Sequence, residues 1–436
     1  FHKGGQGVSL YFCLRETADI TAFIAEASPL QAEPGSVSAA LGRVLAADMH
    51  APVPCPSTRR STRDGYAVRA ADVAGASPAA PVLLHMTGES RMGRPCGGTL
   101  QKGEAWRVYT GSTLPEGADA VLMQEFATLG DQLADSRDAP PVVAVSTPCA
   151  MGENILAPGA DMPQGALLAQ AGTRLGAHHM ALLAQFFKEV PLHRKPVLGV
   201  LSTGDEFCGS EPQNGIAACQ SNTNALLLEG LAASLGANYL HLGTAPDNAQ
   251  ALGQHLRTAL PGGPTPCDVV VVIGGSSAGK RDFSAQAIAG LPGCEVCGHD
   301  QRVSSGRPLT LARVGQTAVW GLPGHSLSLA LAAQVFLAPL LQRLAGQQAS
   351  PQHMNRQPVV LARLGLALPV EGNAPTHYPV MLRREHGRIT AWPVAAGTGK
   401  TAVLRDMDGW ITMPGSDDMS RGGLRRGAAV RVRLFA

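Results

Sequence analysis

The sequence predicts a multi-domain α/β protein. It combines a parallel, doubly wound sheet domain with a helical or extended segment, an inserted small β domain and a C-terminal β domain. The chain has 436 residues, about three times the roughly 150 residues of one domain. Between residues 197 and 344, strand-like apolar runs alternate with helical patterns, which is typical of a parallel sheet. Short apolar runs separated by glycine and proline flank this block and favour small β domains.

The N-terminal part of the chain predicts an elongated helical and linker domain, made of residues 14–71 and 150–190. From about residue 14 to 50, apolar residues recur at spacings near three and four, which predicts helix. Pro52, Pro54 and Pro56 then break this pattern and predict an extended connector. Helical spacing returns over residues 173–187. The first 13 residues lack an apolar segment like that of a signal peptide and are left out of the prediction.

Two further segments predict β domains. Residues 72–149 are rich in Gly, Pro, Val and Thr and contain short apolar runs at 81–84, 120–123 and 142–145, so we expect an inserted small β domain there. Residues 353–436 contain similar runs separated by glycine-containing turns, which predicts a small barrel or sandwich. These C-terminal runs cover 359–364, 378–382, 409–413 and 428–434.

The sheet domain is predicted over residues 191–346. Each expected strand is a short apolar run, and each is followed by an expected helix with apolar residues on one face. The expected strands are 197–201, 237–242, 269–273 and 318–320, and the expected helices are 222–235, 248–260, 282–291 and 326–344.

Composition excludes several classes of protein. The net charge is +2 and neither sign forms a long block, so a nucleic-acid partner or an anionic membrane surface is not indicated. Pure apolar runs stay well short of the roughly 20 residues of a membrane helix. Nine cysteines are scattered, which favours a reducing cytoplasm over a disulfide scaffold. Cys294-Glu-Val-Cys297 alone is a weak metal or redox signal, and incidental thiols explain it better.

Three glycine-bearing loops follow predicted strands and are the first candidates for a site. They are Ser202-Thr-Gly-Asp-Glu206, Gly274-Gly-Ser-Ser-Ala-Gly279 with Asp282 beyond it, and Gly321-Leu-Pro-Gly324 with Ser326 and Ser328 at the next helix start. In an open parallel sheet, ligands bind beyond the carboxyl ends of the strands. Main-chain N–H groups near helix starts attract phosphate. Each loop taken alone also fits a plain turn between strand and helix.

Carboxylates beside an anion site suggest a hard cation, because Mg²⁺ takes one or two carboxylates together with phosphate oxygens. Asp282 and Glu206 are the candidate ligands. Asp247 fits either the site or a helix N-cap, and Asp64 fits a turn carboxylate. Four cations could neutralise phosphates or lie on a solvated surface: Lys280, Arg281, Arg302 and Arg307.

A hydrolase is an alternative reading of the second loop. Gly275-Ser-Ser277-Ala-Gly279 matches the G-x-S-x-G pattern of a nucleophile elbow, and Asp300 and His325 follow in the required order. His325, however, comes directly after a Pro-Gly turn at the start of a helix rather than in a late loop.

The order of motifs along the chain resembles the molybdopterin molybdenumtransferase family. The similarity spans nearly the whole chain, and the sheet domain alone is also similar to the related molybdopterin adenylyltransferase fold. Besides the three loops above, the motifs are Ser61-Thr-Arg-Asp64-Gly-Tyr-Ala67, Thr110-Gly-Ser-Thr-Leu-Pro115-Glu-Gly117-Ala-Asp-Ala-Val121, and Gly152-Glu-Asn-Ile155 with Gly159-Ala-Asp161.

The resemblance implies a four-domain homodimer in the cytoplasm. Its expected activity is binding of adenylylated molybdopterin, release of AMP with Mg²⁺ present, and insertion of molybdate to give molybdenum cofactor. The site would lie between subunits, and the adenylyltransferase is a possible partner. The implied catalytic residues are Asp64, Thr110, Glu206, Asp247 and Asp282, with Glu206 and Asp282 also holding the metal. The implied substrate-binding residues are Asp161, Ser202, Thr203, Gly204, Gly274, Gly275, Ser277, Gly279, Arg307, Pro323, Gly324 and Ser328, with molybdate near Ser277, Arg307 and Ser328.

The chain departs from the family pattern at several positions. Lys280 stands where the family has an acid, and Leu156 stands where it has an arginine. His325-Ser326 replaces Asn-Pro, and Asp300 and Ser304 take two lysine positions. Losing a charged hydrogen bond costs roughly 1.5 to 3 kcal/mol, although Lys280, Arg281 and Arg302 could compensate. A divergent, non-catalytic protein that binds molybdopterin or the cofactor, or acts as a scaffold, is therefore the alternative function.

Overall fold

A computed structural model gives the fold. It describes residues 17–130, 141–204, 222–275, 282–303, 307–347, 358–369, 376–385, 387–394, 401–413 and 423–435. The chain divides into two compact units. Residues 1–47 and 171–436 form the first unit, and residues 48–170 form the second.

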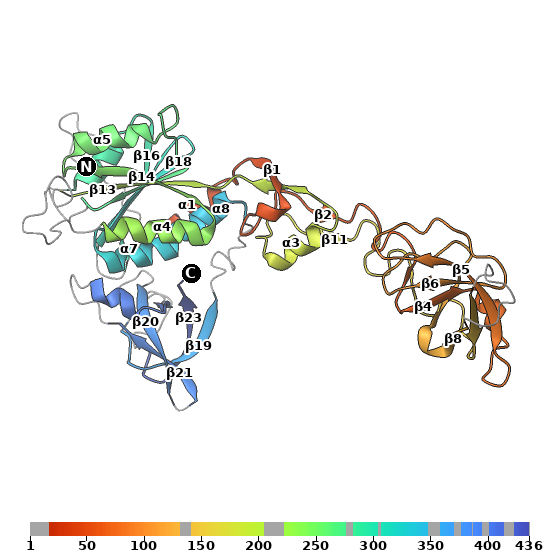
Figure 1. Ribbon diagram of the computed structural model, residues 1–436. Coiled ribbons are helices and arrows are strands. Elements are labelled where there is room, and N and C mark those ends of the chain that lie inside the picture. The colour runs from red at the N-terminus through yellow and green to blue at the C-terminus, as the bar shows by residue number, and fades with distance from the viewer. Residues whose placement is uncertain are drawn as a thin grey trace, which may run out of the picture. The chain divides into compact units, whose positions relative to one another are not determined.

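The first unit contains the predicted sheet domain. Its six-stranded sheet has the order β14-β13-β15-β18-β17-β16 (Figure 1). The four strands expected from the sequence are present and parallel, which confirms the doubly wound prediction. They are β13 (Val197–Thr203), β14 (Asn238–Ala245), β15 (Val269–Ile273) and β18 (Thr317–Leu322).

An antiparallel hairpin extends this sheet and was not predicted. β16 (Cys294–Val303) pairs with β17 (Arg307–Val314), and β17 pairs with β18. The hairpin strands carry many polar residues and lack the continuous apolar run of a buried parallel strand. Arg302 and Arg307, two of the predicted cations that follow the third strand, lie within these paired strands, with Arg307 opposite Val303.

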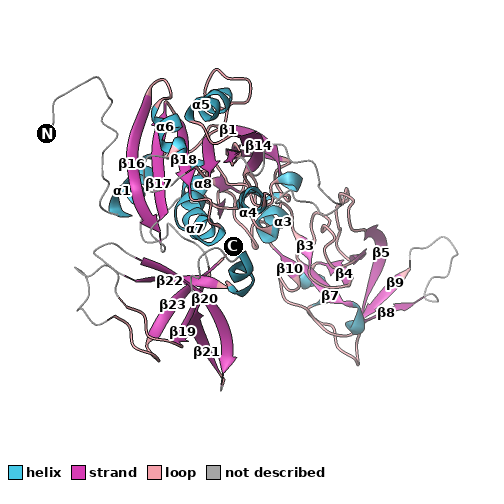
Figure 2. Ribbon diagram, turned by 90° about the vertical axis from the view of Figure 1, so that its left-hand side faces the viewer, coloured by secondary structure: helices cyan, strands magenta, loops and turns pink. Residues whose placement is uncertain are grey.

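Helices cover both faces of the sheet, because alternate residues of each strand point to opposite faces. Val269 and Val271 lie in the cluster that includes α4 (Thr223–Leu235), and Val270 and Val272 lie in the cluster that includes α5 (Ala249–Thr258) and α6 (Phe283–Ala289). The two layers are seen on either side of the sheet in Figures 1 and 2.

A long apolar helical stretch, Ser326–Leu344, crosses one face of the sheet. It consists of α7 (Ser326–Ala332), a π-helical turn η5 (Ala333–Leu337) and α8 (Ala338–Leu344). Pro339 lacks an N–H and would clash with the carbonyl four residues earlier, which accounts for the wider turn before it. The stretch is long and apolar enough to cross a membrane, but 83% of its most apolar window is buried inside the protein, as in a core helix.

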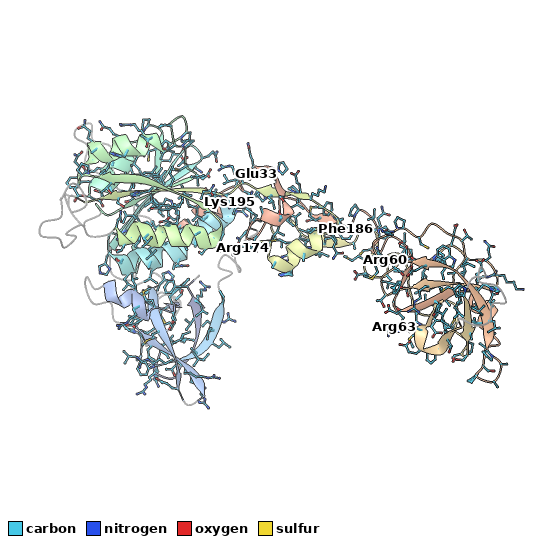
Figure 3. All side chains as sticks on the ribbon, viewed as in Figure 1. Glu33, Arg60, Arg63, Arg174, Phe186 and Lys195 are labelled. Atoms are coloured by element: carbon cyan, nitrogen blue, oxygen red, sulfur yellow. The ribbon has the colours of Figure 1, made fainter. Side chains whose placement is uncertain are left out.

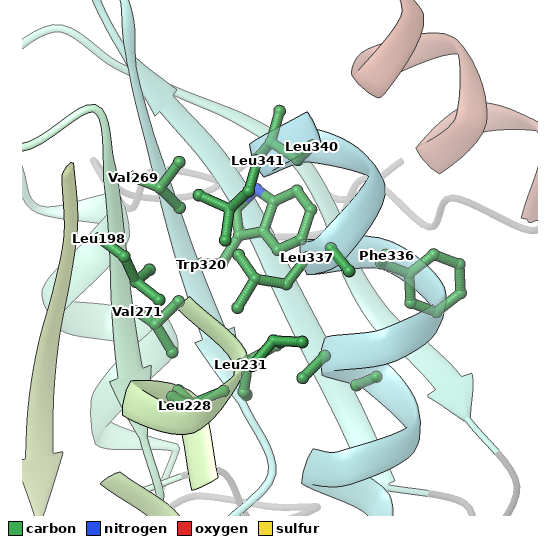
Figure 4. Close-up of a cluster of buried hydrophobic side chains, with 14 of the residues drawn as sticks. Leu198, Leu228, Leu231, Val269, Val271, Trp320, Phe336, Leu337, Leu340 and Leu341 are labelled. Carbon is green, nitrogen blue, oxygen red and sulfur yellow. The ribbon is translucent and has the colours of Figure 1, made fainter. Parts of the chain in front are cut away.

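Trp320 on β18 fills the centre of the larger core cluster (Figure 4). Its side chain is fully buried among residues of the sheet, α4 and the long helical stretch. The N-terminal helix α1 (Thr17–Glu26) adds Ile20 and Ile24 to the same cluster. Phe23 lies with its ring centroid 6.1 Å from that of Trp320.

The helical prediction for residues 14–50 is wrong beyond α1. The chain instead forms β1 (Ala32–Ser36) and a short 3₁₀ helix η1 (Val37–Ala39). β1 pairs antiparallel with β12 (Glu189–His193), which spans the predicted limit between the domains 150–190 and 191–346. Pro34 and Gly35 both disfavour helix, and their effect outweighs the apolar spacing. The helix expected at 173–187 is shorter and is α3 (Ala177–Leu183).

The second unit is built on a six-stranded sheet of order β7-β4-β6-β5-β9-β8. The apolar runs that predicted a β domain form strands of this sheet, but its strand β4 begins at Gly65, before the expected start at residue 72. Its strands are β4 (Gly65–Val68), β5 (Val82–Ser90), β6 (Glu104–Val108), β7 (Ala120–Met123), β8 (Ala127–Gly130) and β9 (Val142–Val145), and its helices are α2 (Ala70–Val73) and η2 (Gln124–Phe126). Two small antiparallel pairs complete the unit: β2 (Met49–His50) with β11 (Leu167–Ala169), and β3 (Arg60–Ser61) with β10 (Ile155–Leu156).

The C-terminal segment forms a closed barrel of order β19-β21-β20-β22-β23, which confirms the predicted barrel-like domain. The expected runs become four of its strands, and β21 was not predicted. The barrel consists of β19 (Val359–Leu364), β20 (Thr376–Glu385), β21 (Arg388–Pro393), β22 (Gly409–Met413) and β23 (Ala429–Leu434), with a short 3₁₀ helix η6 (Thr401–Asp406). Trp410 from β22 joins the Trp320 cluster, so the barrel packs on the sheet domain.

His377 on β20 lies buried where the barrel meets η5, with its ring edge-on to Phe336. Its Nδ1 lies 3.0 Å from the Thr412 hydroxyl, and its Nε2 has no hydrogen-bond partner among the described residues. Burial, with a smaller effect of the Arg433 charge, lowers the pKa of His377 from 6.5 to about 4.

We expect the protein to lose stability on acidification because of this histidine. The neutral form is favoured in the folded state, so the stabilisation is complete above pH 6.5 and is lost as the pH falls toward 4. The free energy of unfolding should fall by roughly 3 kcal/mol over this window. Urea unfolding at a series of pH values measures it. His377→Gln should remove most of this slope, and an unchanged slope in that variant would contradict the assignment.

Candidate functional site

The three predicted glycine-bearing turns come together at one edge of the sheet. β13, β15 and β18 are adjacent and parallel, and their last residues are in register: Ser202 lies opposite Ile273, which lies opposite Leu322. The turns that follow therefore leave the sheet side by side. The Gly274 N–H donates to the Leu322 carbonyl at 3.2 Å, which ties two of the turns directly.

Glycine is required where these turns touch. Gly275 has a φ of +64°, and a Cβ there would lie 2.4 Å from the Ser284 hydroxyl oxygen. A Cβ on Gly274 would lie 3.0 Å from the Thr203 carbonyl oxygen, and one on Gly324 would lie 3.3 Å from the Gly274 Cα. Since the N–H groups of Gly204 and Gly274 donate to the carbonyls of Ala245 and Leu322, these two glycines shape the turns rather than offer their amides to a ligand.

Hydrogen bonds orient the polar side chains of this edge. The Thr203 hydroxyl donates to an Asp247 carboxylate oxygen at 2.5 Å, although the two residues are 44 positions apart. Asn248, not Asp247, caps α5, since the Asn248 side chain accepts from the Ala251 N–H. The helix-cap alternative for Asp247 is therefore wrong, and its carboxylate lies beside the turn that follows β13.

Two asparagines hold the neighbouring turns and were missed by the sequence reasoning. The Asn222 amide donates to the Ser202 hydroxyl at 2.5 Å, and its oxygen caps α4 by accepting from the Ala225 N–H. The Asn224 amide donates to the Gly324 carbonyl at 2.7 Å. The available signal was a pair of asparagines at the expected start of a helix, where capping residues are common.

Asp282 lies at the same edge and is almost completely buried. Its carboxylate caps α6 by accepting from the Ala285 N–H at 2.9 Å. Ser284, the second residue of α6, donates to the Gly274 carbonyl at 2.6 Å and so fixes the glycine turn to the helix start. Ser328, a predicted substrate contact, is also buried, within α7. Pro323 and Gly324 occupy the turn between β18 and α7.

The carboxylates fit a ligand-bridged cation better than a protein cage. Among the described residues, no group of three or more His, Cys, Asp or Glu side chains could hold a metal ion. Asp282 and Asp247 both lie beside the turns that follow the strands. Mg²⁺ commonly takes one or two carboxylates and completes its shell with water and phosphate oxygens, and the residues present fit that mode.

Several predicted residues lie outside the described part of the chain. These are Glu206, Ser277 and Gly279, together with Lys280, Arg281 and Ser304. For Arg302, Arg307 and Asp300 only the backbone is described, as is the case for Cys297 of the Cys-x-x-Cys pair. The hydrolase alternative depends on Ser277, which lies outside the described residues, and on the Asp300 side chain, which is not described either. His325 lies directly before α7.

A second group of predicted residues meets in the second unit. Both the main-chain N–H and the hydroxyl of Thr110 donate to one carboxylate oxygen of Asp64, at 2.7 and 2.9 Å. These bonds, with a smaller effect of the Arg107 charge, hold the pKa of the Asp64 carboxyl below its ordinary value. The pair, 46 positions apart, is therefore one structural feature with an ionised, exposed carboxylate.

A ring of charged and aromatic side chains surrounds this pair. The Tyr109 hydroxyl donates to Glu89 at 2.7 Å, and Arg91 donates to the other carboxylate oxygen of Glu89 at 2.8 Å. Asp64, Glu89, Arg91, Met92, Tyr109 and Thr110 line an open hollow of about 520 Å³. The Arg107 guanidinium lies 5.0 Å from the ring centroid of Tyr66 and 5.5 Å from that of Tyr109.

Other residues of the second unit lie near or apart from this hollow. Arg60 lies on β3, and Arg63 lies in the turn between β3 and β4 that also contains Asp64 (Figure 3). Arg60 donates to the Gly111 carbonyl at 3.2 Å, next to Thr110. Asp161 is exposed, and its main-chain N–H donates to the Cys55 carbonyl at 3.1 Å. No hydrogen bond joins Asp161 to Asp64 or Thr110 in this described region, so its assignment to the site stays a prediction.

Thr110→Ala is expected to raise the pKa of Asp64 part of the way to its ordinary value. The substitution removes the hydroxyl donor but keeps the main-chain N–H, which is the larger of the two causes. Carbon-detected NMR titration of the Asp64 carboxyl would measure the change. Thr110→Ser is the matched control because it keeps a hydroxyl, and we expect the unchanged pKa there. Equal titration of the Ala variant and the unchanged protein would contradict the role of the hydroxyl.

Comparison with known proteins agrees with this architecture. Residues 15–186 match the family described as "MoeA N-terminal region (domain I and II)", and residues 199–343 match "Probable molybdopterin binding domain". A molybdopterin molybdenumtransferase of Haemophilus influenzae is 30% identical over 332 residues, covering 75% of this chain and 77% of that protein. One of Bacillus subtilis is 28% identical over 398 residues, covering 91% and 88%.

Solved structures show the same fold. The crystal structure of a molybdopterin biosynthesis MoeA protein from Pyrococcus horikosii superposes with a TM-score of 0.78 at 28% identity, covering 97% of this chain and 99% of that one. Fold and site together define the class: a multi-domain α/β protein built around a molybdopterin-binding type of sheet domain. With the relatives above, the chain belongs to the molybdopterin molybdenumtransferase family of molybdenum cofactor biosynthesis.

Proposed function

We propose that this protein inserts molybdenum into adenylylated molybdopterin, releasing AMP and giving molybdenum cofactor. The observation that carries the proposal is the meeting of three glycine-bearing turns at the carboxyl edge of the molybdopterin-binding type of domain, with Asp247 and Asp282 beside them. The family relatives named above support the reaction class.

The chain's own residues would bind and orient the substrate. Thr203 holds the Asp247 carboxylate in one orientation, and the start of α6 holds that of Asp282. Asn222 and Asn224 fix the turns themselves, so the edge is formed before a ligand arrives. A pre-formed polar site needs little reorganisation during reaction, which is how enzymes gain most from electrostatic groups.

Glu206 and Asp282 are the residues that we propose to hold Mg²⁺. When bound, Mg²⁺ would neutralise negative charge on the phosphate oxygens of the substrate. The Asp282 carboxylate is almost completely buried and is held at the start of α6. Ser277, Gly279, Arg307 and Ser328 remain the proposed contacts of substrate and molybdate.

We further propose a cytoplasmic homodimer in which the site is completed between subunits. The proposed catalytic residues fall in both units of the chain, with Asp64 and Thr110 in one and Asp247 and Asp282 in the other. A two-subunit site would let each group act on the same substrate. Contact with a molybdopterin adenylyltransferase, which would deliver the adenylylated substrate, belongs to the same proposal.

The decisive experiment is an AMP-release assay. Purified protein is incubated with adenylylated molybdopterin, Mg²⁺ and molybdate, and AMP is quantified against a reference enzyme of the family. We expect AMP release that requires molybdate and Mg²⁺. No release under conditions where the reference enzyme is active would overturn the proposed reaction.

A second candidate function is binding or scaffolding without turnover. The departures at Lys280, Asp300, Ser304 and His325 favour it, because each changes a position where the family pattern has another residue type. Calorimetry with molybdopterin distinguishes the two functions: tight binding without AMP release supports the binding protein. A variant with both lysines restored, Asp300→Lys and Ser304→Lys, should gain activity if these departures cause the deficit.

A further inference from the structure

The C-terminal barrel has a net positive charge, whereas the rest of the chain is net negative. Residues 358–436 contain 11 Lys and Arg against 6 Asp and Glu, a net charge of +5. The rest of the chain has 24 basic and 27 acidic residues and is therefore net negative by 3. The net charge of the whole chain, +2, therefore conceals a positive barrel and a negative remainder. A domain with such an excess of positive charge has a strong local electrostatic field.

Strand register gathers the arginines on the outer face of the barrel. On β23, Arg431 and Arg433 lie opposite Leu361 and Val359 of β19. Arg363 of β19 lies beside Thr390 of β21, which in turn lies opposite Arg383 of β20. Since neighbouring strands are about 4.8 Å apart, these side chains occupy one continuous outer surface. We call it the arginine face and define it as Arg363, Arg383, Arg388, Arg425, Arg431 and Arg433.

The arginine face is exposed and is not neutralised by ion pairs. All six side chains are exposed, and none forms an ion pair in the described part of the chain. Arg363 donates to the Gly427 carbonyl at 2.8 Å. This bond holds the turn that contains Arg425 next to Arg363. Two acids lie near this face: Glu385 is opposite Arg388 and accepts from the Trp392 indole N–H, and Asp406 pairs with Arg405. The six arginines still outnumber these acids.

Exposed aliphatic side chains lie among these arginines. Leu361 is 73% exposed and Val359 is 50% exposed, and each lies opposite an arginine. Exposed leucine among arginines is typical of protein–protein interfaces. Arginine is enriched at such interfaces, and the apolar side chains at their centre become buried when the partner binds. Leu366 and Ile389 add to the exposed apolar area of the barrel.

The chemistry of the arginine face favours one kind of partner. A second copy of the chain docking through the same face would bring arginines of equal sign together at a two-fold interface, which is unfavourable. Proteins bind single-stranded nucleic acid through exposed aromatic side chains on which the bases stack. The exposed apolar residues of the arginine face are aliphatic instead, which disfavours nucleic acid as the partner. An acidic protein segment with aliphatic residues complements both features.

We propose that the arginine face of the barrel is a docking surface for an acidic segment of another protein, with its aliphatic side chains seated on Leu361 and Val359. The surface lies outside the site described above and does not depend on the proposed reaction. Attraction between opposite charges would raise the rate of association, and binding would weaken with salt.

The test uses the full chain and a labelled synthetic peptide that repeats Asp-Glu-Leu. Fluorescence anisotropy compares this peptide with an Asn-Gln-Leu version and with a single-stranded DNA of equal length. We expect the acidic peptide to bind most tightly, and its Kd to rise at least about tenfold in Arg363→Glu/Arg431→Glu or when salt rises to about 0.5 M. Leu361→Ser should weaken binding without changing the salt dependence. Arg257→Glu on α5, an exposed arginine away from the barrel, is the matched control and should bind as the unchanged protein does.

Three results would overturn the proposal. These are equal binding of the acidic and amide peptides, tighter binding of the DNA, or equal loss in the double variant and the Arg257→Glu control. Circular dichroism melting checks that each variant is folded. Reversing charge within a cationic surface reduces repulsion, whereas Arg363→Glu also removes the hydrogen bond to the Gly427 carbonyl, so the melting temperature of the double variant is compared with that of the unchanged protein. If it does melt lower, Arg431→Gln replaces it in the binding comparison.

Discussion

Asp282→Asn is expected to lower the rate of AMP release by roughly 100-fold, the size of effect seen when one electrostatic group is removed from an active site. Asparagine caps a helix as well as aspartate does, so its side-chain oxygen can still accept from the Ala285 N–H. The free energy of unfolding should therefore change little. Only the charge offered to a cation or a substrate is lost.

Asp282→Ala is the matched control for this prediction. It removes both the charge and the cap of α6, so it should lose activity and also about 1 kcal/mol of stability. Rates of AMP release and urea unfolding of both variants would be measured side by side. Undiminished activity in Asp282→Asn would show that this residue serves only as a helix cap.

Trp320→Ala is expected to cost about 3 to 5 kcal/mol of the free energy of unfolding, the usual loss for a large buried aromatic side chain. Trp320 is completely buried and contacts the sheet, α1 and the long helical stretch (Figure 4). Its removal leaves a cavity that several elements line, and they cannot all collapse into it. Urea unfolding would measure the loss.

Trp320→Phe separates volume from polarity at this position. The indole N–H of Trp320 has no hydrogen-bond partner among the described residues, so phenylalanine removes an unsatisfied donor while keeping an aromatic ring. We expect it to cost much less than the alanine variant. A loss below about 1 kcal/mol in Trp320→Ala, smaller than a buried aromatic normally gives, would contradict the central place of this side chain in the core.

The sheet domain was predictable because its strands are buried on both faces. Val269–Ile273 is apolar at every position, and all five side chains are buried, which makes a strong local signal. The helices between the strands were equally clear, since tight packing on a sheet demands one apolar face. The residues that begin them, such as Asn222 and Asp282, fell at the expected starts.

Elements stabilised by distant partners were not predictable. β1 exists because it pairs with β12, which lies more than 150 residues further along the chain. The β16–β17 hairpin depends on the edge of β18, and its mixed polarity gives no clear period. The local sequence does not reveal which distant strand such a segment pairs with, because strand pairing depends on the tertiary context.

The candidate site divides in the same way. The three turns at the sheet edge followed from the rule that ligands bind beyond the carboxyl ends of strands. The hydrogen bonds from Thr203 to Asp247 and from the Asn224 amide to the Gly324 carbonyl depend on side-chain positions, which the sequence does not reveal. Asp64 and Thr110 were chosen from a family resemblance, and their two hydrogen bonds supply a physical reason for the choice.

The closed C-terminal barrel limits how anything can attach to it. A sheet that joins its first and last strands leaves no open edge, so an incoming peptide cannot add itself as one more strand. Recognition there has to run through side chains, and it can be tuned by single substitutions without disturbing the backbone. The same closure protects the domain from edge-to-edge self-association.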